Sequence, residues 1–191
     1  MEKTRRCQDA ELAKDLLMKQ FRCVALAALL SAPAFSYSQP HVQVGFSPEG
    51  SARQLVLETI QSAHQSIHML AYAFQAPDIT QALVDAKNRG VDVRIVIDRK
   101  RNLNKASKAA MDLVTRNSIE LRTNDHFHLH HDKTIIVDSN AVQTGSFNYA
   151  PSAETLNSEN VVVIRDMPEV SRQYLAHWQS RWELGKPYPA R

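Results

Sequence analysis

Hydrophobic residues recur at two different spacings beyond about residue 40, and these spacings predict strands alternating with helices. Period-two or continuous apolar runs, typical of strands, occupy 42–47, 66–74, 91–97, 119–123, 134–137, 141–145 and 161–164. Helical spacing occupies 51–63, 78–88, 104–115 and 168–184. Asp78 is predicted to cap its helix, Gly90 to follow its end, and Pro168 to open the last helix.

The order of these segments predicts the fold class. Strands that alternate with helices indicate an α/β domain, with a central β-sheet that helices flank on both faces. The segments 134–137 and 141–145 are close enough to pair as neighbouring strands, with Asp138, Ser139 and Asn140 as the turn. The predicted sheet is therefore mixed, with parallel and antiparallel neighbours.

The first 38 residues differ from the rest and predict a signal peptide. A mostly apolar stretch, 21–35, begins beside basic residues and ends in small ones. This order is typical of secretory leaders, and the stretch is short for a bilayer-spanning helix. We expect a leader at 1–38, a single domain at 39–191, a periplasmic or secreted location, and no stable membrane insertion after cleavage. The alternative for the apolar stretch is a buried N-terminal helix.

Loss of that leader changes the charge and the cysteine content. Residues 1–38 contain six of the 23 Lys and Arg residues and four of the 20 Asp and Glu residues. The domain keeps 17 basic and 16 acidic residues, a net charge of about +1, so global basicity is no argument for a nucleic-acid partner. Cys7 and Cys23 both lie in the predicted leader, which leaves the domain without a disulfide or a cysteine metal site.

One short segment concentrates groups suited to chemistry on phosphate esters. The pattern H-x-K-x4-D-x6-G-S-x-N occurs once and is formed by His131, Lys133, Asp138, Gly145, Ser146 and Asn148. Alternation along a strand predicts that His131 and Lys133 share one face, and that Ser146 and Asn148 share another at the end of the next strand. Histidine can attack phosphorus covalently, while ammonium, hydroxyl and amide groups hold oxygens where charge develops. These donors need no metal or cofactor, but a second histidine must protonate the leaving oxygen.

This pattern resembles the signature of the phospholipase D superfamily, and every signature position matches. The resemblance covers about residues 42–182, and a short chain with one copy is most similar to the bacterial endonuclease branch, the Nuc type. Nuc-type members pair two single motifs by forming a homodimer. The resemblance implies that His131 of one subunit is the nucleophile and that His131 of the partner subunit is the general acid and then the base. It also implies that Lys133 and Asn148 of both subunits bind phosphate, with Ser146 assisting.

The resemblance implies roles for three further residues. In this family a downstream acidic residue orients the histidine ring, and Glu159 stands where that carboxylate is expected. It would hold the tautomer and stabilise the imidazolium, as the carboxylate of a catalytic triad does. Asp138 lies at the predicted turn, so we expect a mainly structural role for it, and Gly145 is a structural residue of the motif.

Other groups of residues have both a functional and a structural interpretation. Histidines that alternate along a strand can chelate zinc, but we expect no metal at His126, His128, His130 and His131, since the resemblance needs none. A basic run after a predicted central strand is either a solvated face or a set of nucleic-acid contacts, and it comprises Arg99, Lys100, Arg101, Lys105 and Lys108. Trp178 and Trp182, one helical turn apart, are expected in core or dimer packing rather than base stacking.

These observations predict a phosphodiesterase, and most simply a non-specific, metal-independent endonuclease. It would cleave DNA, or also RNA, through a phosphohistidine intermediate as a homodimer. One alternative is a phospholipase D-like hydrolase of phospholipid head groups, although the domain lacks an obvious amphipathic lipid-binding segment. A second alternative is a non-catalytic nucleic-acid-binding dimer, against which the intact His131, Lys133 and Asn148 argue.

Overall fold

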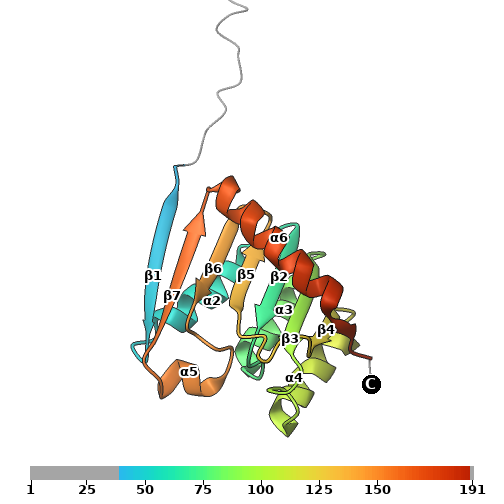
Figure 1. Cartoon of the computed structure of the whole chain (residues 1–191). Helices are drawn as coiled ribbons and strands as arrows, with labels where there is room; N and C mark the ends of the chain where they lie inside the picture. The colour runs from blue at the N-terminus through green and yellow to red at the C-terminus, as the bar shows by residue number, and fades with distance from the viewer. Residues whose placement is uncertain (1–38, 190–191) are drawn as a thin grey trace, which may run out of the picture. The chain divides into compact units, whose positions relative to one another are not determined.

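An eight-stranded sheet runs through the domain in the order β1-β7-β6-β5-β2-β3-β4-β8 (Figure 1). This computed structural model describes residues 39–189, so the predicted leader at 1–38 lies outside the described residues. The strands are β1 (His41–Ser47), β2 (Ser66–Ala71), β3 (Asp92–Asp98), β4 (Glu120–Asn124), β5 (Lys133–Val137), β6 (Ala141–Gly145), β7 (Glu159–Arg165) and β8 (Lys186–Pro187). The helices are α2 (Ser51–Gln61), α3 (Pro77–Asn88), α4 (Lys105–Arg116), α5 (Pro151–Thr155) and α6 (Pro168–Leu184).

The sheet is mixed because two kinds of connection build it. β2, β3 and β4 are parallel neighbours, and α3 and α4 make the crossovers between them. β5, β6, β7 and β1 follow as antiparallel neighbours, and β5 joins the two halves by pairing with β2. The predicted α/β class with a mixed central sheet is therefore confirmed.

Two short elements and one helix cap differ from the sequence prediction. α5 has five residues and β8 has two, too few for a hydrophobic period to be recognised. Asp78 does not cap α3, because Ala76 is the cap residue and Pro77 opens the helix. Proline at the first helical position already has a helical φ and no N–H to satisfy, so Asp78 moves into the first turn.

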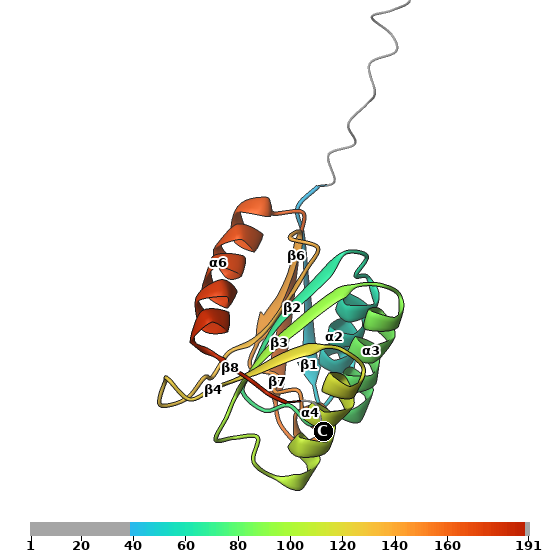
Figure 2. The same cartoon turned by 90° about the vertical axis from the view of Figure 1, so that its right-hand side faces the viewer.

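Helices cover the two faces of the sheet unequally (Figure 2). α2, α3 and α4 lie on one face, where the larger core includes the fully buried Ile60, Leu83 and Ile95. α6 alone crosses the other face, and Trp178 and Trp182 pack there against buried residues of β2, β3, β5 and β6. Both tryptophans are buried, as the packing interpretation predicted. Within residues 39–189, no helix has the length and apolar character needed to cross a membrane.

Asp138 clamps the turn between β5 and β6. Its backbone has a φ of 52°, and its carboxylate accepts hydrogen bonds from the backbone N–H groups of His64, Gln65 and Ser66 at 2.8–2.9 Å. Burial raises the pKa of the Asp138 carboxyl, but the three N–H donors outweigh burial and hold this pKa below its ordinary value. The contacts support the structural role expected for Asp138, because they tie the turn to the start of β2.

Replacing Asp138 with Ala is expected to lower the free energy of unfolding by about 2 kcal/mol, since it removes a charged acceptor from three donors. Asp138→Asn should cost less, because its amide oxygen keeps one or two of the bonds. Urea unfolding measures both variants. The pKa of Asp138 is lowered by folding, so its contribution is complete above the ordinary value of 3.8 and disappears as the pH falls through the folded-state pKa. A difference between wild type and Asp138→Ala that persists unchanged at about pH 2 would contradict this account.

Candidate active site

The motif residues meet at one edge of the sheet because β5 and β6 are antiparallel neighbours. Ile135 pairs with Gln143, which brings the start of β5 at Lys133 beside the end of β6 at Gly145. His131 lies two residues before β5, and Ser146 follows β6 directly. Residues from both ends of an 18-residue segment therefore face one another across two strands.

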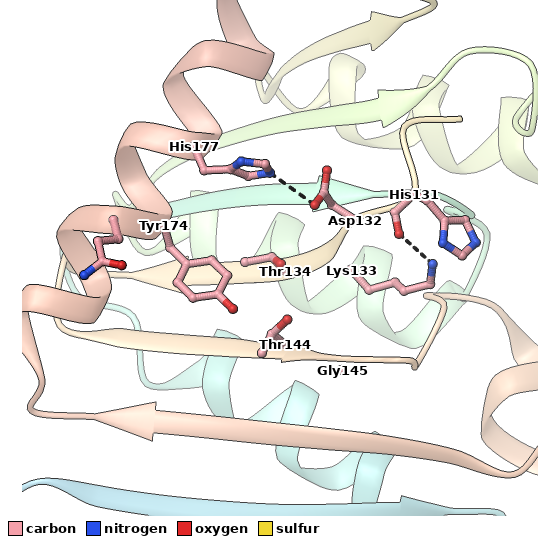
Figure 3. Close-up of a pocket in the computed structure, with 9 residues that line it drawn as sticks. His131, Asp132, Lys133, Thr134, Thr144, Gly145, Tyr174 and His177 are labelled. Atoms are coloured by element: carbon pink, nitrogen blue, oxygen red, sulfur yellow. Dashed lines mark hydrogen bonds and ion pairs between the residues drawn. The ribbon is translucent and has the colours of Figure 1, made fainter. Parts of the chain in front are cut away.

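His131 is exposed and is held by its backbone and by an aromatic neighbour. Its ring lies against Tyr72 at a centroid distance of 4.5 Å, and its carbonyl accepts a hydrogen bond from Lys133 Nζ at 2.7 Å (Figure 3). The prediction that His131 and Lys133 share one strand is wrong, because β5 begins at Lys133. β2, the neighbour of β5, ends at Ala71 opposite Lys133, so the chain before Lys133 has no strand to pair with. His131, Asp132 and Lys133 line the same pocket.

Lys133 is a buried cation at the base of the site. Its side chain is buried, and Nζ lies 5.1 Å from the centre of the Tyr72 ring. Burial lowers the pKa of Lys133, and the carboxylates of Asp132 and Glu159 act in the opposite direction. A desolvated ammonium group gains more from an incoming anion than an exposed one does, so Lys133 is well placed to bind phosphate.

Glu159 contacts Ser146 instead of the predicted His131. Ser146 Oγ donates to Glu159 Oε2 at 2.6 Å, and Asn157 Nδ2 donates to Oε1 at 2.9 Å. Among residues 39–189, no hydrogen bond joins Glu159 to His131, and the bonds that its carboxylate accepts come from Ser146 and Asn157. Ser146 Oγ also accepts from the backbone N–H of Asn160 at 3.0 Å, so the hydroxyl is fixed from two sides.

Asn148 lies in a tightly anchored segment after β6 and is not among the residues that line the pocket beside the motif. Phe147 and Tyr149 on either side of it are fully buried, and the Tyr149 hydroxyl donates to Gln143 Oε1 at 2.8 Å. Asn148 Oδ1 is buried without a hydrogen-bond partner among the described residues. An amide oxygen only accepts hydrogen bonds, so a phosphate oxygen would have to bind the Nδ2 donor of this amide instead.

Gly145 permits the turn that leads to these residues. Its φ is 146°, and a Cβ atom at this position would lie 2.3 Å from the carbonyl oxygen of Asn160. Backbone cannot yield that much space, so a side chain would push β6 and β7 apart. The glycine of the motif is therefore required by the close approach of two strands.

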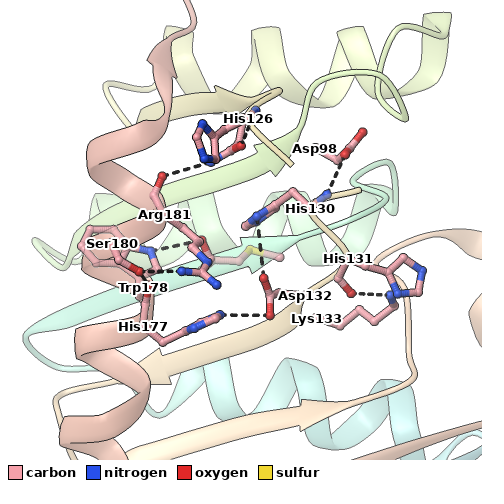
Figure 4. Close-up of polar contacts among 12 residues, drawn as sticks. Asp98, His126, His130, His131, Asp132, Lys133, His177, Trp178, Ser180 and Arg181 are labelled. Atoms are coloured by element: carbon pink, nitrogen blue, oxygen red, sulfur yellow. Dashed lines mark hydrogen bonds and ion pairs between the residues drawn. The ribbon is translucent and has the colours of Figure 1, made fainter. Parts of the chain in front are cut away.

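A second polar network adjoins the motif and was not foreseen from the sequence (Figure 4). Asp132 Oδ1 lies 3.2 Å from Nε2 of His177 on α6, and Oδ2 lies 3.7 Å from Nδ1 of the buried His130. Burial lowers the pKa of His130, and the charges of Asp132 and Asp98 oppose that shift. Asp98 accepts from the backbone N–H of His130 at 2.9 Å, which holds the loop before His131. His177 is 46 positions from His131 in the sequence, and no motif joins them.

The pocket beside the motif lies between β5, β6 and α6 and has a volume of about 420 Å³. Figure 3 shows His177 and Tyr174 projecting from α6 toward the strands. The residues that line it are His131, Asp132, Lys133, Thr134, Thr144, Gly145, Gln173, Tyr174 and His177. An imidazole, a buried ammonium and several hydroxyls at one opening suit attack on a phosphate diester.

Some residues of the histidine cluster and of the basic run lie near the site, and others lie away from it. Among the described residues, no three or more His, Cys, Asp and Glu side chains are placed to hold a metal ion, and His126, His128, His130 and His131 do not converge. Arg101 lies over the Tyr72 ring at 5.9 Å, whereas Arg99 is paired with Asp125 at 2.7 Å. Lys100 and Lys105 are exposed on the loop and at the start of α4.

Comparisons with known proteins agree with this geometry. The family model for the cardiolipin synthase, phospholipase D-like domain matches residues 56–182. A phospholipase D of Rickettsia bellii is 38% identical over 144 residues, which cover 75% of this chain and 70% of the relative. The mitochondrial cardiolipin hydrolase of Canis lupus familiaris is 29% identical over 185 residues, 96% of this chain and 72% of the relative. The crystal structure of Nuc from Salmonella typhimurium, a phospholipase D family member, has a TM-score of 0.79 and 56% identity, covering 80% of this chain and all of Nuc.

The fold and the site together define a phosphodiester hydrolase. The chain belongs to the phospholipase D superfamily, and its single motif and its likeness to Nuc place it with the Nuc type.

Two neighbouring acidic residues, which we call the acidic pair, connect α5, the helix that follows the motif, to α3. Glu154 on α5 lies beside Asp78 on α3, and Arg53 on α2 pairs with Asp78 at 2.5 Å and with Glu154 at 3.6 Å. Burial, the charge of Asp78 and a hydrogen bond to Asp78 raise the pKa of Glu154 to about 7, while Arg53 opposes the shift. The protonated form of Glu154 is thus favoured in the folded protein.

Stability should fall as Glu154 ionises. Its pKa is raised by folding, so the folded state binds more protons between its ordinary value of 4.5 and about 7, and the free energy of unfolding decreases across that window. Glu154→Gln should remove this decrease and be about 1 kcal/mol more stable than wild type at pH 8, an amount reduced by solvent screening. Thermal unfolding from pH 5 to pH 8 measures it. Glu58→Gln, on the exposed side of α2, is the matched control, and an equal effect of both variants would refute the role of the acidic pair.

Proposed function

We propose that this phosphodiester hydrolase is a metal-independent endonuclease that cleaves nucleic acid through a phosphohistidine, as a homodimer exported from the cytoplasm. The observation that carries the proposal is that the exposed His131 and the buried Lys133 line one pocket. A nucleophile and polar groups for a phosphate stand together, and the second histidine that the chemistry needs is absent from the motif of one chain.

The proposed reaction has two steps. In the first, a ring nitrogen of His131 attacks phosphorus, the P–O bond to the leaving alkoxide breaks, and His131 of the partner subunit donates a proton to that oxygen. In the second, the partner's His131 takes a proton from water, the hydroxide oxygen attacks phosphorus, and the P–N bond breaks to free the first imidazole. Each histidine ends the cycle in the protonation state in which it began.

The surrounding residues would stabilise charge without a metal or other cofactor. Lys133 and Asn148 of both subunits would hold the non-bridging oxygens, where negative charge grows in the transition state. Glu159 would keep Ser146 Oγ in position through the 2.6 Å hydrogen bond, so its effect on the phosphate would be exerted through Ser146. Arg99, Lys100, Arg101 and Lys105 are proposed contacts for flanking phosphates of the strand.

An exposed apolar stripe supports the homodimer. Val42, Val44 and Phe46 on β1 are each more than half exposed and follow the two-residue period that places them on one face. α6 packs on β2, β4, β5 and β6, and in Figure 1 β1 and β7 lie to the left of α6, which does not cross them. Val44 pairs with Val162, which pairs with Thr144 of the pocket, so the stripe continues into the site. A two-fold dimer would cover the same stripe on both subunits.

A phospholipid substrate is the second candidate function, because two relatives carry the names phospholipase D and mitochondrial cardiolipin hydrolase. Parallel assays of plasmid nicking and of head-group release from phosphatidylcholine and cardiolipin vesicles distinguish the two. A non-catalytic nucleic-acid-binding dimer is the third, and binding without nicking would support it. We expect nicking with an excess of chelator, and loss of nicking on chelation would contradict the metal-independent reaction.

His131→Ala is expected to lower the nicking rate by at least about 10³-fold, because it removes the nucleophile and the acid together. His128→Ala is the matched control, since His128 is an exposed histidine of the same loop and does not line the pocket. The rates are measured on supercoiled plasmid. If His131→Ala retained more than a trace of activity, or if His128→Ala lost as much, His131 would not be the nucleophile.

A further inference from the structure

Five cations lie close together where β3 passes into α4. They are Arg99, Lys100, Arg101, Lys105 and Lys108, and residues 99–111 contain no Asp or Glu. Within the described part of the chain, Arg99 alone of the five forms an ion pair, with Asp125 at 2.7 Å. Asp125 is shared with Lys186 at 3.2 Å, so one carboxylate serves two cations and the surface stays strongly positive.

A cavity of about 240 Å³ opens within this basic surface. Arg99 and Lys108 line it together with the apolar side chains of Leu103 and Met111 and the ring of Tyr188. The Tyr188 hydroxyl donates to Asp112 at 2.7 Å, which helps to fix the ring. Leu103 is 59% exposed, so its side chain is accessible to a ligand in the cavity. The cavity therefore offers apolar and aromatic surface beside two positive charges.

The basic surface is connected to the active site through shared contacts. Arg101 lies 5.9 Å from the centre of the Tyr72 ring, and the same ring contacts His131 and Lys133. Asp98 accepts from the backbone N–H of Arg101 at 2.6 Å and from that of His130, so one buried carboxylate holds both loops. Cations thus extend from Lys133 past Arg101 to the cavity.

We propose that this cavity is a distal subsite that binds one nucleotide of a single-stranded segment of the substrate, beyond the nucleotides at the scissile phosphate. The inference rests on the proposed endonuclease function and names the form of its substrate. Arg99 and Lys108 each bind one of the two phosphates that flank this nucleotide, and its unstacked base or sugar contacts Leu103, Met111 and Tyr188. The volume is below the roughly 300 Å³ of pockets for drug-sized ligands, which fits a single base rather than an acyl chain. A duplex keeps its bases stacked and uses the cations alone.

Equilibrium binding to the His131→Ala protein tests the subsite without cleavage. The probes are fluorescent single strands of about 16 and about four nucleotides. Arg99→Ala combined with Lys108→Ala should weaken binding of the long strand on the order of tenfold and lower the slope of log K against log salt by about 1.4, as loss of two phosphate contacts predicts. The short strand, which occupies the catalytic site alone, should lose less than about twofold in affinity.

Two control variants test whether a loss of affinity comes from misfolding or from the change in net charge. Lys108→Ala alone removes a side chain that has no hydrogen bond or ion pair with the described residues, and it should give about half of the salt effect. Lys87→Ala removes one positive charge near the end of α3, at the opposite end of the sheet, and should leave the affinity unchanged.

Three results would overturn the subsite. One is an equal loss for both strand lengths, and another is an equal loss with Lys87→Ala. The third is a double variant that binds the long strand like its parent but loses binding to phosphatidylglycerol–phosphatidylcholine vesicles, which would assign the surface to lipid. If the His131→Ala protein bound neither strand before the cations were changed, the proposed endonuclease function would fail together with the subsite. Unchanged binding of the long strand by the double variant, as in the third result, would overturn the subsite alone.

Discussion

The antiparallel pairing of β5 with β6 is the constraint on which the site depends. It places Lys133 beside Gly145, and so brings the His131 and Ser146 ends of one segment together. Asp138 fixes that pairing from the far end, where three backbone N–H groups bind its carboxylate. A shift of one residue would turn Lys133 to the opposite face of the sheet. The motif aspartate therefore acts on the chemistry through the register of two strands.

The fold could be predicted because the strands and long helices have clear hydrophobic periods. The motif could be recognised because its six residues stand at fixed spacings in the sequence. Prediction from the sequence failed where the place of a side chain depends on contacts between segments that are distant along the chain. His131 was expected on a strand, but strands need partners, and β2 ends opposite Lys133. Glu159 was expected to contact His131, but its carboxylate accepts hydrogen bonds from Ser146 and Asn157. The contact of Asp132 with His177 joins a loop to α6, and no local spacing encodes it.

The two faces of the sheet are covered to different extents. Three helices close one face and supply most of the buried core, whereas α6 covers only part of the other. The uncovered part carries exposed valines on β1 and continues into the pocket. An incomplete set of catalytic groups and an incompletely covered face thus lie side by side, and a second subunit placed there would complete both. The basic loop after β3 lies toward the other edge of the sheet, beside β4, where a long substrate would leave the site.

The central claim is that one site uses His131 from two chains. Wild-type and His131→Ala subunits, unfolded together and refolded at varied ratios, test it most directly through plasmid nicking. If both histidines are required, only wild-type pairs are active, and nicking follows the square of the wild-type fraction, about one quarter of full activity in an equal mixture. Nicking in direct proportion to the wild-type fraction, about one half in that mixture, would show that each chain works alone and would contradict the account.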